Sequence, residues 1–334
     1  HYDQKSLRLY ARNRYGESTL DHRFFPELGI GTFRRLLLRN SGNGWKLAFM
    51  RDASGDEWAV GMGLDSQAWR PSIVYLNGLY WGIQNLRERI DSHYLASRHA
   101  INNSQIDLIQ NTVKSGDLLQ WNKLTSFFGT WENINQDQRL SQLGEFVNID
   151  NLIDYVIAQI FLANTDWPLN NVRKWRPRHE NGKWQWIPYD LDGILGVLNR
   201  SPSEDTFRHK VISLNHVGRP VFIKIIQKIL AEEKGRQRFA HRFTTHMQTT
   251  LSEDNILRAI DRLNAAMNVR LSNTIRSAVA RPPDINDKNC KAGQKGIYCE
   301  DPRLSAGREG WEVKVLLCDA DELPYLTESQ MGLY

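Results

Sequence analysis

Carboxylate and amide side chains gather in two short segments near the middle of the 334-residue chain. The first segment holds Asp166 and, five residues later, Asn171, and the second holds Asp190 and Asp192, followed by a glycine. Their oxygen atoms are hard donors of the kind that Mg²⁺ prefers, and Mg²⁺ is usually held by one or two carboxylates together with substrate phosphates. These residue types therefore indicate a site for a divalent cation and a phosphorylated ligand.

The elements expected around these segments would bring them together. Apolar residues at helical spacing predict a helix that is capped by Asp150 and ends at Asn164, directly before the first segment. Strands over 172–175 and 183–187 are predicted to form a hairpin through Asn181-Gly182, because Asn-Gly between apolar runs favours a tight turn. Asp166 and Asn171 then share one loop, and the second segment follows directly at the end of the hairpin.

The order of these features matches the arrangement used for phosphoryl transfer in protein kinases. There a catalytic-loop Asp is followed five residues later by a metal-binding Asn, then by a hairpin, and then by the metal-binding Asp of an Asp-x-Gly turn. Either segment alone is more often a set of turn or helix caps, since Asp and Asn bond readily to nearby backbone. The two segments in this order favour a functional site.

The rest of the chain predicts an α+β fold in two lobes. Residues 1–90 are expected to be mostly strands, with a hairpin through Asn77-Gly78 and a short helix within 45–58. Residues 91–280 are expected to be mainly helical, with 91–148 resembling a surface insertion, and 281–334 an irregular extension with a possible strand at 313–317. The expected domains are therefore a strand-rich lobe (1–90), a helical lobe (91–280) and a C-terminal extension (281–334).

Composition excludes several classes of protein. With 41% hydrophobic and 24% charged residues, the chain has the balance of a globular protein and not of a disordered one. The net charge of +5 is spread without a block of like charges, so no nucleic-acid partner is expected. No run approaches the roughly 18 apolar residues that a transmembrane helix needs, so no transmembrane segment is expected.

Two of the three cysteines, Cys290 and Cys299, lie nine residues apart in a polar segment that contains glycine. This spacing suits a loop-closing disulfide in an exported protein, and two free surface thiols are the alternative. Zinc is not expected, because no pair of cysteines has Cys-x-x-Cys spacing. On this basis we expect a secreted, cell-surface or periplasmic protein.

Longer strings resemble the CotH kinase family, which is named for a spore-coat protein, over most of residues 4–275. The matching strings include Leu38-Arg-Asn-Ser-Gly-Asn43, Leu86-Arg-Glu-Arg-Ile-Asp91, Asn164-Thr-Asp-Trp-Pro-Leu-Asn-Asn171 and Trp186-Ile-Pro-Tyr-Asp-Leu-Asp192. The resemblance implies an atypical protein-kinase-like fold, with a β-rich N-lobe and a helical C-lobe, that binds ATP with Mg²⁺ or Mn²⁺. Members of the family usually carry a further strand and turn before the part that begins at Lys5.

The resemblance also implies roles for the polar segments. Asp166 is similar to the catalytic-loop Asp that accepts the proton of the attacking hydroxyl. Asn171 and Asp190 are similar to the two metal ligands, with Asp192 as the less certain neighbour. Lost turnover with retained nucleotide binding would then be expected on changing Asp166, and lost nucleotide binding on changing Asp190.

Nucleotide contacts are implied for three residues of the strand-rich lobe. Lys5 lies in the strand that resembles the nucleotide-contacting one, and its ammonium could reach the phosphates. Leu86 to Glu88 follow the hairpin where a kinase has its hinge, so their backbone could pair with adenine. The alternatives are an exposed strand lysine and a solvated, salt-bridged turn. Arg51 and Asp52 could supply the charge partner inside the same lobe.

The expected function is that of a CotH-like protein kinase, a phosphotransferase that moves phosphate from Mg-ATP to Ser or Thr of a protein acceptor. Two alternatives remain. The same fold could transfer AMP or ligate glutamate, because a fold does not determine its reaction. The chain could also be a non-catalytic surface adhesin or structural protein.

Overall fold

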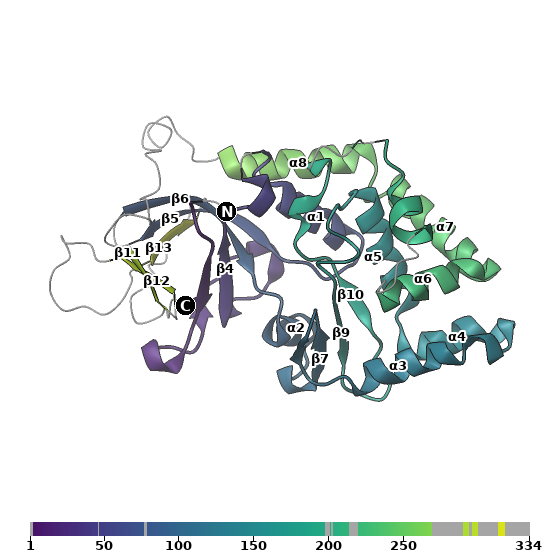
Figure 1. Cartoon of the computed structure of the whole chain (residues 1–334). Helices are drawn as coiled ribbons and strands as arrows, with labels where there is room; N and C mark the ends of the chain where they lie inside the picture. The colour runs from purple at the N-terminus through teal and green to yellow at the C-terminus, as the bar shows by residue number, and fades with distance from the viewer. Residues whose placement is uncertain are drawn as a thin grey trace. The chain divides into compact units, whose positions relative to one another are not determined.

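The computed structural model describes residues 3–45, 47–76, 79–197, 201, 203–213, 220–268, 290–293, 296–299 and 313–317 (Figure 1). Helices and strands are mixed in these residues, which confirms the predicted α+β class. The chain divides into two compact units. Unit 1 comprises His1–Trp45, Ala68–Arg89 and Arg262–Tyr334, and unit 2 comprises Lys46–Gln67 and Ile90–Asp261. The predicted lobe boundaries at residues 90 and 280 stay a prediction.

Unit 1 contains a five-stranded antiparallel sheet in the order β1-β4-β6-β5-β13. Its strands are β1 (Leu7–Tyr10), β4 (Arg35–Arg39), β6 (Leu79–Glu88), β5 (Trp69–Leu76) and β13 (Val313–Leu317). Strands β5 and β6 form the predicted hairpin, and β13 confirms the strand expected near the end of the chain. A second pair, β2 (Leu20–Asp21) and β3 (Thr32–Phe33), is also antiparallel.

Alternation along β4 builds the apolar core of unit 1. Leu36 and Leu38 are fully buried, whereas the arginines at both ends of the strand are half-buried. The two leucines pack with Leu9 of β1, Leu86 of β6 and Phe25, all fully buried. Successive side chains on a strand point to opposite faces, so this two-residue period places one face of the sheet against the core.

The predicted cysteine pair lies in a short hairpin of β11 (Cys290–Gly293) and β12 (Gly296–Cys299). Cys290 and Cys299 stand opposite each other in its register. Their side chains lie outside the described part of the chain, so the disulfide stays a prediction.

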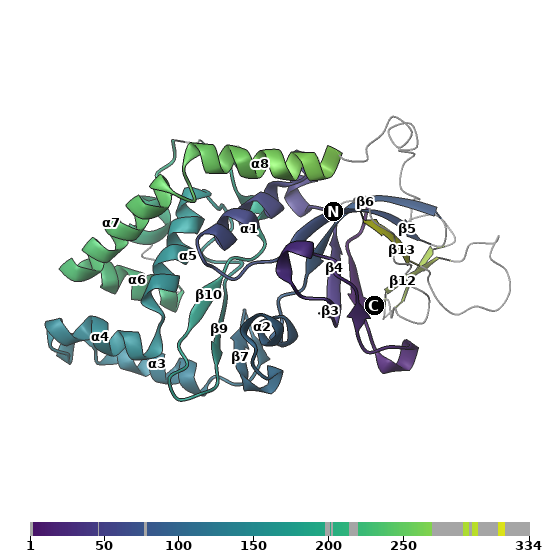
Figure 2. The same ribbon diagram turned by 180° about the vertical axis from the view of Figure 1, so that it is seen from behind.

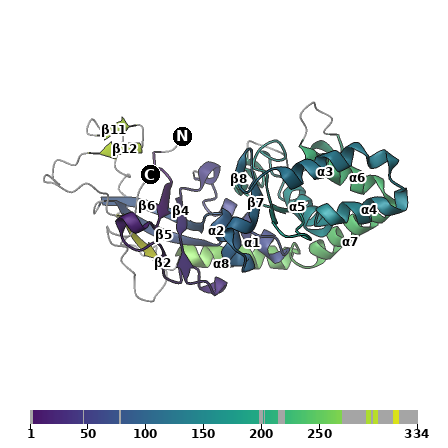
Figure 3. The ribbon, with the colours of Figure 1, turned by 90° about the horizontal axis from the view of Figure 1, so that it is seen from below.

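Unit 2 contains a four-stranded antiparallel sheet in the order β10-β9-β7-β8. Its strands are β7 (Ile106–Ile109), β8 (Val113–Ser115), β9 (Arg173–Pro177) and β10 (Gln185–Ile187). The hairpin β9–β10 was predicted, but β7 and β8 correct the helical interpretation of residues 91–148. Strand β7 is buried at every position and pairs with β9, so tertiary pairing decides the conformation of this short apolar run. Figure 3 shows β7 beside α2.

The helices of unit 2 surround α5. They are α1 (Arg51–Gly61), α2 (Ser92–His99), α3 (Leu119–Gly129), α4 (Gln136–Phe146), α5 (Ile149–Phe161), α6 (Val221–Ala231), α7 (Glu233–Gln248) and the first part of α8 (Glu253–Asn268). Helix α5 lies between β10 and α7 and also contacts α1 (Figures 1 and 2). No helix in the described ranges is long and apolar enough to cross a membrane.

Helix α5 begins and ends earlier than its apolar stripe predicted. Its N-cap is Asn148, whose side chain accepts a hydrogen bond from the backbone N–H of Asn151 at 3.2 Å. Asp150, the predicted cap, lies in the first turn and pairs with Arg238 at 2.7 Å. The helix ends at Phe161, which leaves the residues before Asp166 available for a loop.

Lys174 of β9 provides a test of the packing beneath α3. Its Nζ atom lies 4.2 Å from the centroid of the Trp121 ring, and burial lowers the pKa of Lys174 to about 8 from its ordinary value of 10.5. Burial disfavours the ammonium because it removes water from around the charge. We expect Lys174→Met to raise the free energy of unfolding at pH 7 by about 1–3 kcal/mol.

The pH dependence gives the sign of this effect. Between pH 8 and pH 10.5 the unfolded chain binds more protons at Lys174 than the folded chain does, so wild-type stability rises across this window. The difference in the free energy of unfolding between wild type and Lys174→Met should therefore become smaller as the pH rises. Denaturant unfolding at several pH values measures it, with the exposed Lys183→Met as a control that shows no such gap. A gap that is constant with pH would contradict the prediction.

Candidate active site

The two polar segments lie in unit 2 and contact each other. Loop 164–171 follows α5, and the turn η6 (Leu191–Gly193) follows β10. The backbone N–H and the side-chain hydroxyl of Thr165 both donate to the carbonyl oxygen of Gly193, at 3.0 and 2.9 Å. The loop that carries Asp166 is thereby fastened to the turn that carries Asp190 and Asp192.

Gly193 allows this close approach. A Cβ atom at position 193 would lie 3.1 Å from the hydroxyl oxygen of Thr165 and 3.3 Å from the amide oxygen of Asn164. These separations are tighter than ordinary van der Waals contacts, so any larger residue would push the loop away from the turn. The glycine after the second acidic residue therefore has a packing role in the site.

A pair of buried amides positions the backbone of Asp166. Asn164 and Gln159 are each 1% exposed. The Nδ2 atom of Asn164 donates to Oε1 of Gln159 at 2.8 Å, and the backbone N–H of Asp166 donates to Oδ1 of Asn164 at 3.2 Å. Since Gln159 lies within α5, this chain of hydrogen bonds ties the loop to the most buried helix of the unit.

Asp166 and Asn171 converge, as their shared loop predicted. The amide Nδ2 of Asn171 lies 3.4 Å from Oδ2 of Asp166, and both side chains are half-buried. A turn closes the loop between them, because the backbone N–H of Asn170 donates to the carbonyl of Asp166 at 3.1 Å. Asn171 has a φ of 56°, in the left-handed region that Asn tolerates better than most residues.

Asp190 and Asp192 have different surroundings. Asp190 is half-buried at the end of the hairpin and has left-handed backbone angles, φ 58° and ψ 60°. Asp192 is only 6% exposed. Burial lowers the pKa of the Arg51 guanidinium, and the neighbouring charge of Asp192 opposes that shift. Asp192 therefore balances a half-buried positive charge, whereas Asp190 is the more accessible carboxylate.

The start of α1 holds the turn from its other side. Oδ1 of Asp52 accepts a hydrogen bond from the backbone N–H of Leu191 at 2.8 Å. Nη1 of Arg51 donates to the carbonyl oxygens of Ile194 and, at 2.8 Å, of Leu195. Arg51 and Asp52 thus belong to unit 2, where they support the acidic turn, and not to the strand-rich unit 1 in which they were expected to supply a charge partner.

Helix α1 rests on this turn at Gly55, where a Cβ atom would lie 2.7 Å from Cδ1 of Leu191 and 3.0 Å from Cδ1 of Ile194. We expect Gly55→Ala to lower the free energy of unfolding by about 1–2 kcal/mol, because the buried Leu191 and Ile194 side chains must repack and this cost exceeds the gain of about 1 kcal/mol from the helix propensity of Ala. The matched control is Gly129→Ala in α3, where a Cβ atom meets nothing within 4 Å and Ala favours the helix. Denaturant unfolding checks both variants, and equal effects would contradict the packing argument.

Lys210 was not identified from the sequence. Its Nζ atom donates to the carbonyl oxygen of Thr165 at 3.0 Å, so a second segment holds the loop one residue before Asp166. An isolated lysine carries no signal for such a contact. Gln159 did carry one, since it is a polar residue within the apolar second half of the helix.

The remaining predicted site residues lie in unit 1. Lys5 precedes β1 by two residues and is half-buried, so it does not lie in a strand as expected. Its carbonyl oxygen accepts a hydrogen bond from Nε2 of Gln84 at 2.8 Å.

Leu86 and Glu88 lie in β6, a central strand that pairs with β4 on one side and β5 on the other. Leu86 is fully buried, and Oε2 of Glu88 accepts a hydrogen bond from the backbone N–H of Ala68 at 3.0 Å. The backbone of Leu86 pairs with strands on both sides, and Glu88 pairs with Leu36 of β4. Contact of this stretch with an adenine base stays a prediction.

The donor set of the two polar segments fits a magnesium ion with bound phosphates. In the described part of the chain, no group of three or more His, Cys, Asp or Glu residues forms a metal site. Mg²⁺ does not require such a group, because it keeps several waters and takes its other ligands from phosphate. Asp190, Asp192 and Asn171 supply two carboxylates and one amide oxygen on segments that contact each other.

Comparison with protein families yields a match over most of the chain. A family model with the description "CotH kinase protein" matches residues 1–281. No match was found among curated proteins. The matched region covers most of the chain and contains every residue predicted for the site.

Proposed function

This chain belongs to the CotH kinase family, a family with kinase-like function, and from that premise we propose that it transfers the γ-phosphoryl group of Mg-ATP to a Ser or Thr hydroxyl of a protein. The observation that supports this proposal most directly is the contact between loop 164–171 and the turn at 191–193, through Thr165 and Gly193. It brings together the two segments that the kinase arrangement requires.

Asp166 is the proposed proton acceptor. The proton of the acceptor hydroxyl passes to a carboxylate oxygen of Asp166 while the new oxygen–phosphorus bond forms and the bond to the leaving ADP oxygen breaks. The 3.4 Å contact with Asn171 and the backbone bond to Asn164 orient the carboxylate for this transfer. Positioning supplies much of the rate in such reactions.

Asp190 and Asn171 are the proposed metal-binding residues. Mg²⁺ bound there would neutralise the negative charge that develops on the phosphate oxygens. Asp192 has a different proposed role, because its charge balances the half-buried guanidinium of Arg51. Arg51 in turn holds the carbonyls that follow the turn, so Asp192 supports the shape of the site.

Mass spectrometry after incubation with Mg-ATP tests the proposed reaction. Phosphate, AMP and glutamate add different masses, so a single experiment separates phosphoryl transfer from AMP transfer and from glutamate ligation. Addition of phosphate to Ser or Thr of the chain itself, or of co-incubated proteins, supports the proposal. Addition of AMP or glutamate alone, or no Mg-ATP binding at all, would overturn it and favour one of the alternatives. We further propose an exported location, which rests on the cysteine spacing alone.

A further inference from the structure

A cluster of four buried aromatic rings includes a residue of loop 164–171. The rings belong to Tyr155 of α5, Trp167 of the loop, Trp186 of β10 and Phe222 of α6, and each residue is at most 2% exposed. The ring centroid of Phe222 lies 6.0 Å from that of Tyr155, 5.8 Å from that of Trp167 and 6.3 Å from that of Trp186. Trp167 directly follows Asp166, so this cluster supports the loop that carries the proposed proton acceptor.

Three buried polar atoms accompany these rings, namely the hydroxyl of Tyr155, Nε1 of Trp167 and Nε2 of Gln159. Tyr155 and Gln159 lie one turn apart on the same face of α5. Hydrogen bonding from the Trp167 and Gln159 side chains lowers the pKa of the Tyr155 hydroxyl, although burial raises this pKa more. These contacts fall short of full hydrogen-bond geometry, and none of the three atoms has a closer partner among the described residues. The Tyr155 oxygen is therefore the acceptor that the described residues offer to both N–H groups.

The contact with Tyr155 is the last step of a chain of donors that runs in one direction. The backbone N–H of Asp166 donates to Oδ1 of Asn164 at 3.2 Å, and Nδ2 of Asn164 donates to Oε1 of Gln159 at 2.8 Å. This direction leaves Nε2 of Gln159 as a buried donor, and a buried donor is costly without an acceptor. The hydroxyl oxygen of Tyr155 supplies that acceptor and so favours the observed orientation of both amides.

We infer that Tyr155 is a positioning residue for the proposed phosphoryl transfer, because its hydroxyl oxygen holds the two side chains that fix the backbone around Asp166. Those side chains are Gln159, which acts through Asn164, and Trp167, which directly follows Asp166. The catalytic consequence rests on the proposed function. Without the oxygen both N–H groups lose their acceptor, and the carboxylate of Asp166 is held less well for proton transfer. Positioning of this kind supplies much of the rate in such reactions.

Tyr155→Phe tests the inference, because it removes the oxygen and keeps the ring that packs against Phe222. We expect kcat for phosphate incorporation to fall about 5- to 50-fold, while KM for Mg-ATP stays within about twofold of the wild-type value. The two parameters should separate because Asp190, the proposed metal ligand, lies on another turn, which Asp52 holds through Leu191. A raised KM with unchanged kcat would overturn the inference.

A second readout needs neither nucleotide nor phosphoryl transfer. Amide hydrogen exchange of the full chain reports how tightly loop 164–171 is held, since the N–H of Asp166 bonds to Asn164 and the N–H of Asn170 bonds to the carbonyl of Asp166. In Tyr155→Phe these two amides should exchange about 5- to 50-fold faster, whereas amides within α7 should change much less. A general loss of stability would instead speed exchange in both regions alike, and that result would overturn the inference.

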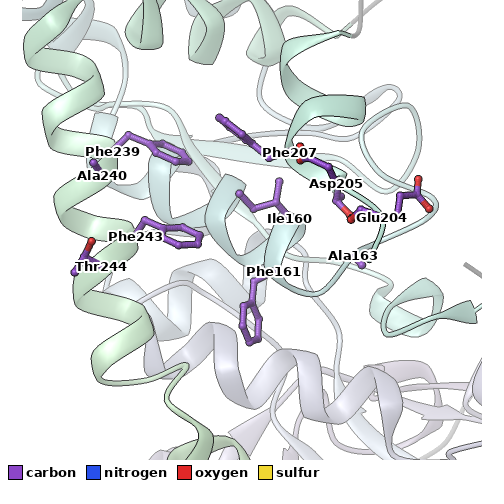
Figure 4. Close-up of a pocket in the computed structure, with 11 residues that line it drawn as sticks. Ile160, Phe161, Ala163, Glu204, Asp205, Phe207, Phe239, Ala240, Phe243 and Thr244 are labelled. Carbon is purple, nitrogen blue, oxygen red and sulfur yellow. The ribbon is translucent and has the colours of Figure 1, made fainter. Parts of the chain in front are cut away.

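Two matched controls separate the Tyr155 hydroxyl from packing in general. Tyr94→Phe removes another buried hydroxyl of unit 2, which donates to the carbonyl oxygen of Ser66 at 2.7 Å. Ile160→Val trims α5 itself at the wall of a cavity of about 510 Å³ (Figure 4). Neither control should change kcat, or the exchange of the loop relative to α7, by more than about twofold. A thermal unfolding scan confirms that each variant is folded, and the same selective loss in Tyr94→Phe would overturn the inference.

Gln159→Leu completes the test, because it breaks the chain of donors one step nearer to Asp166. If Tyr155 acts through Gln159, adding Tyr155→Phe to Gln159→Leu should speed the exchange of the loop clearly less than Tyr155→Phe does alone. Fully additive effects would show that the two side chains act independently, and would overturn the inference. If the wild-type chain binds Mg-ATP but transfers no phosphate, the proposed function fails, whereas the exchange measurements still decide whether Tyr155 positions the loop.

Discussion

Asp166→Asn is expected to lower phosphoryl transfer by about 10²- to 10⁴-fold while the affinity for Mg-ATP stays close to that of wild type, because contributions of a general base have this size. The substitution keeps the shape of the side chain and removes its charge. The loop should keep its conformation, since Asn164 bonds to the backbone N–H of residue 166 and Thr165 bonds to Gly193 independently of the carboxylate. The loss would therefore fall on the chemical step.

Two measurements separate the possibilities for Asp166. Initial rates of phosphate incorporation give turnover, and calorimetric titration with Mg-ATP gives affinity. Asp137→Asn, an exposed aspartate of α4, is the matched control and should change neither. Loss of both binding and transfer would move Asp166 into the metal site. Unchanged transfer would show that another residue accepts the proton, and would contradict the mechanism.

Asp190→Asn is expected to weaken Mg-dependent binding of ATP by about 10²-fold or more, because losing a metal ligand costs at least as much as losing an outer hydrogen-bond partner of a metal site. Asn is the better choice than Ala, since residue 190 has a φ of 58° and Asn tolerates this left-handed conformation. The backbone of the turn should then be preserved, and the change is confined to one charge.

Titration of ATP with and without Mg²⁺ measures this effect. In wild type, Mg²⁺ should tighten ATP binding, and in Asp190→Asn that difference should disappear. Asp192→Asn is the informative comparison, because it should instead lower the thermal stability by leaving the half-buried charge of Arg51 less balanced. If Asp190→Asn retains the full effect of Mg²⁺ and Asp192→Asn loses it, the metal role belongs to Asp192.

Local sequence signals predicted the elements nearest the site. Asn181-Gly182 identified the β9–β10 hairpin, and the apolar stripe after residue 150 identified α5. The same stripe misplaced both ends of α5. It missed the start because the cap is the side chain of Asn148, which lies outside the apolar pattern. Strand β7 was missed because four residues are too few to show a period, and its partner β9 follows more than sixty residues later.

The order of the polar segments predicted that they would meet, and the contact between Thr165 and Gly193 agrees with this. The supports of the site could not be predicted in the same way. Asp52 reaches Leu191 across 139 positions of the chain, and Lys210 reaches Thr165 across 45. Similarly, the pairing of Leu86 with Leu38 of β4 is set by residues far earlier in the chain. Long-range contacts of this kind leave no periodicity or turn signal.

The bonds from the start of α1 to the acidic turn have a consequence for how the chain acquires its site. Loop 164–171 and the hairpin β9–β10 assemble from neighbouring residues, but the turn after them is completed by Asp52 and Arg51, which are synthesised far earlier. Bringing together two segments so far apart in the chain costs conformational entropy before the contact between them can stabilise the fold. We therefore expect this contact to form late in folding. A fragment that begins at residue 90 would keep α5 and the hairpin but would lack the hydrogen bonds from Arg51 and Asp52 that shape the turn. Such a truncation would retain much of its helical content and yet lose the ligand-binding conformation of Asp190.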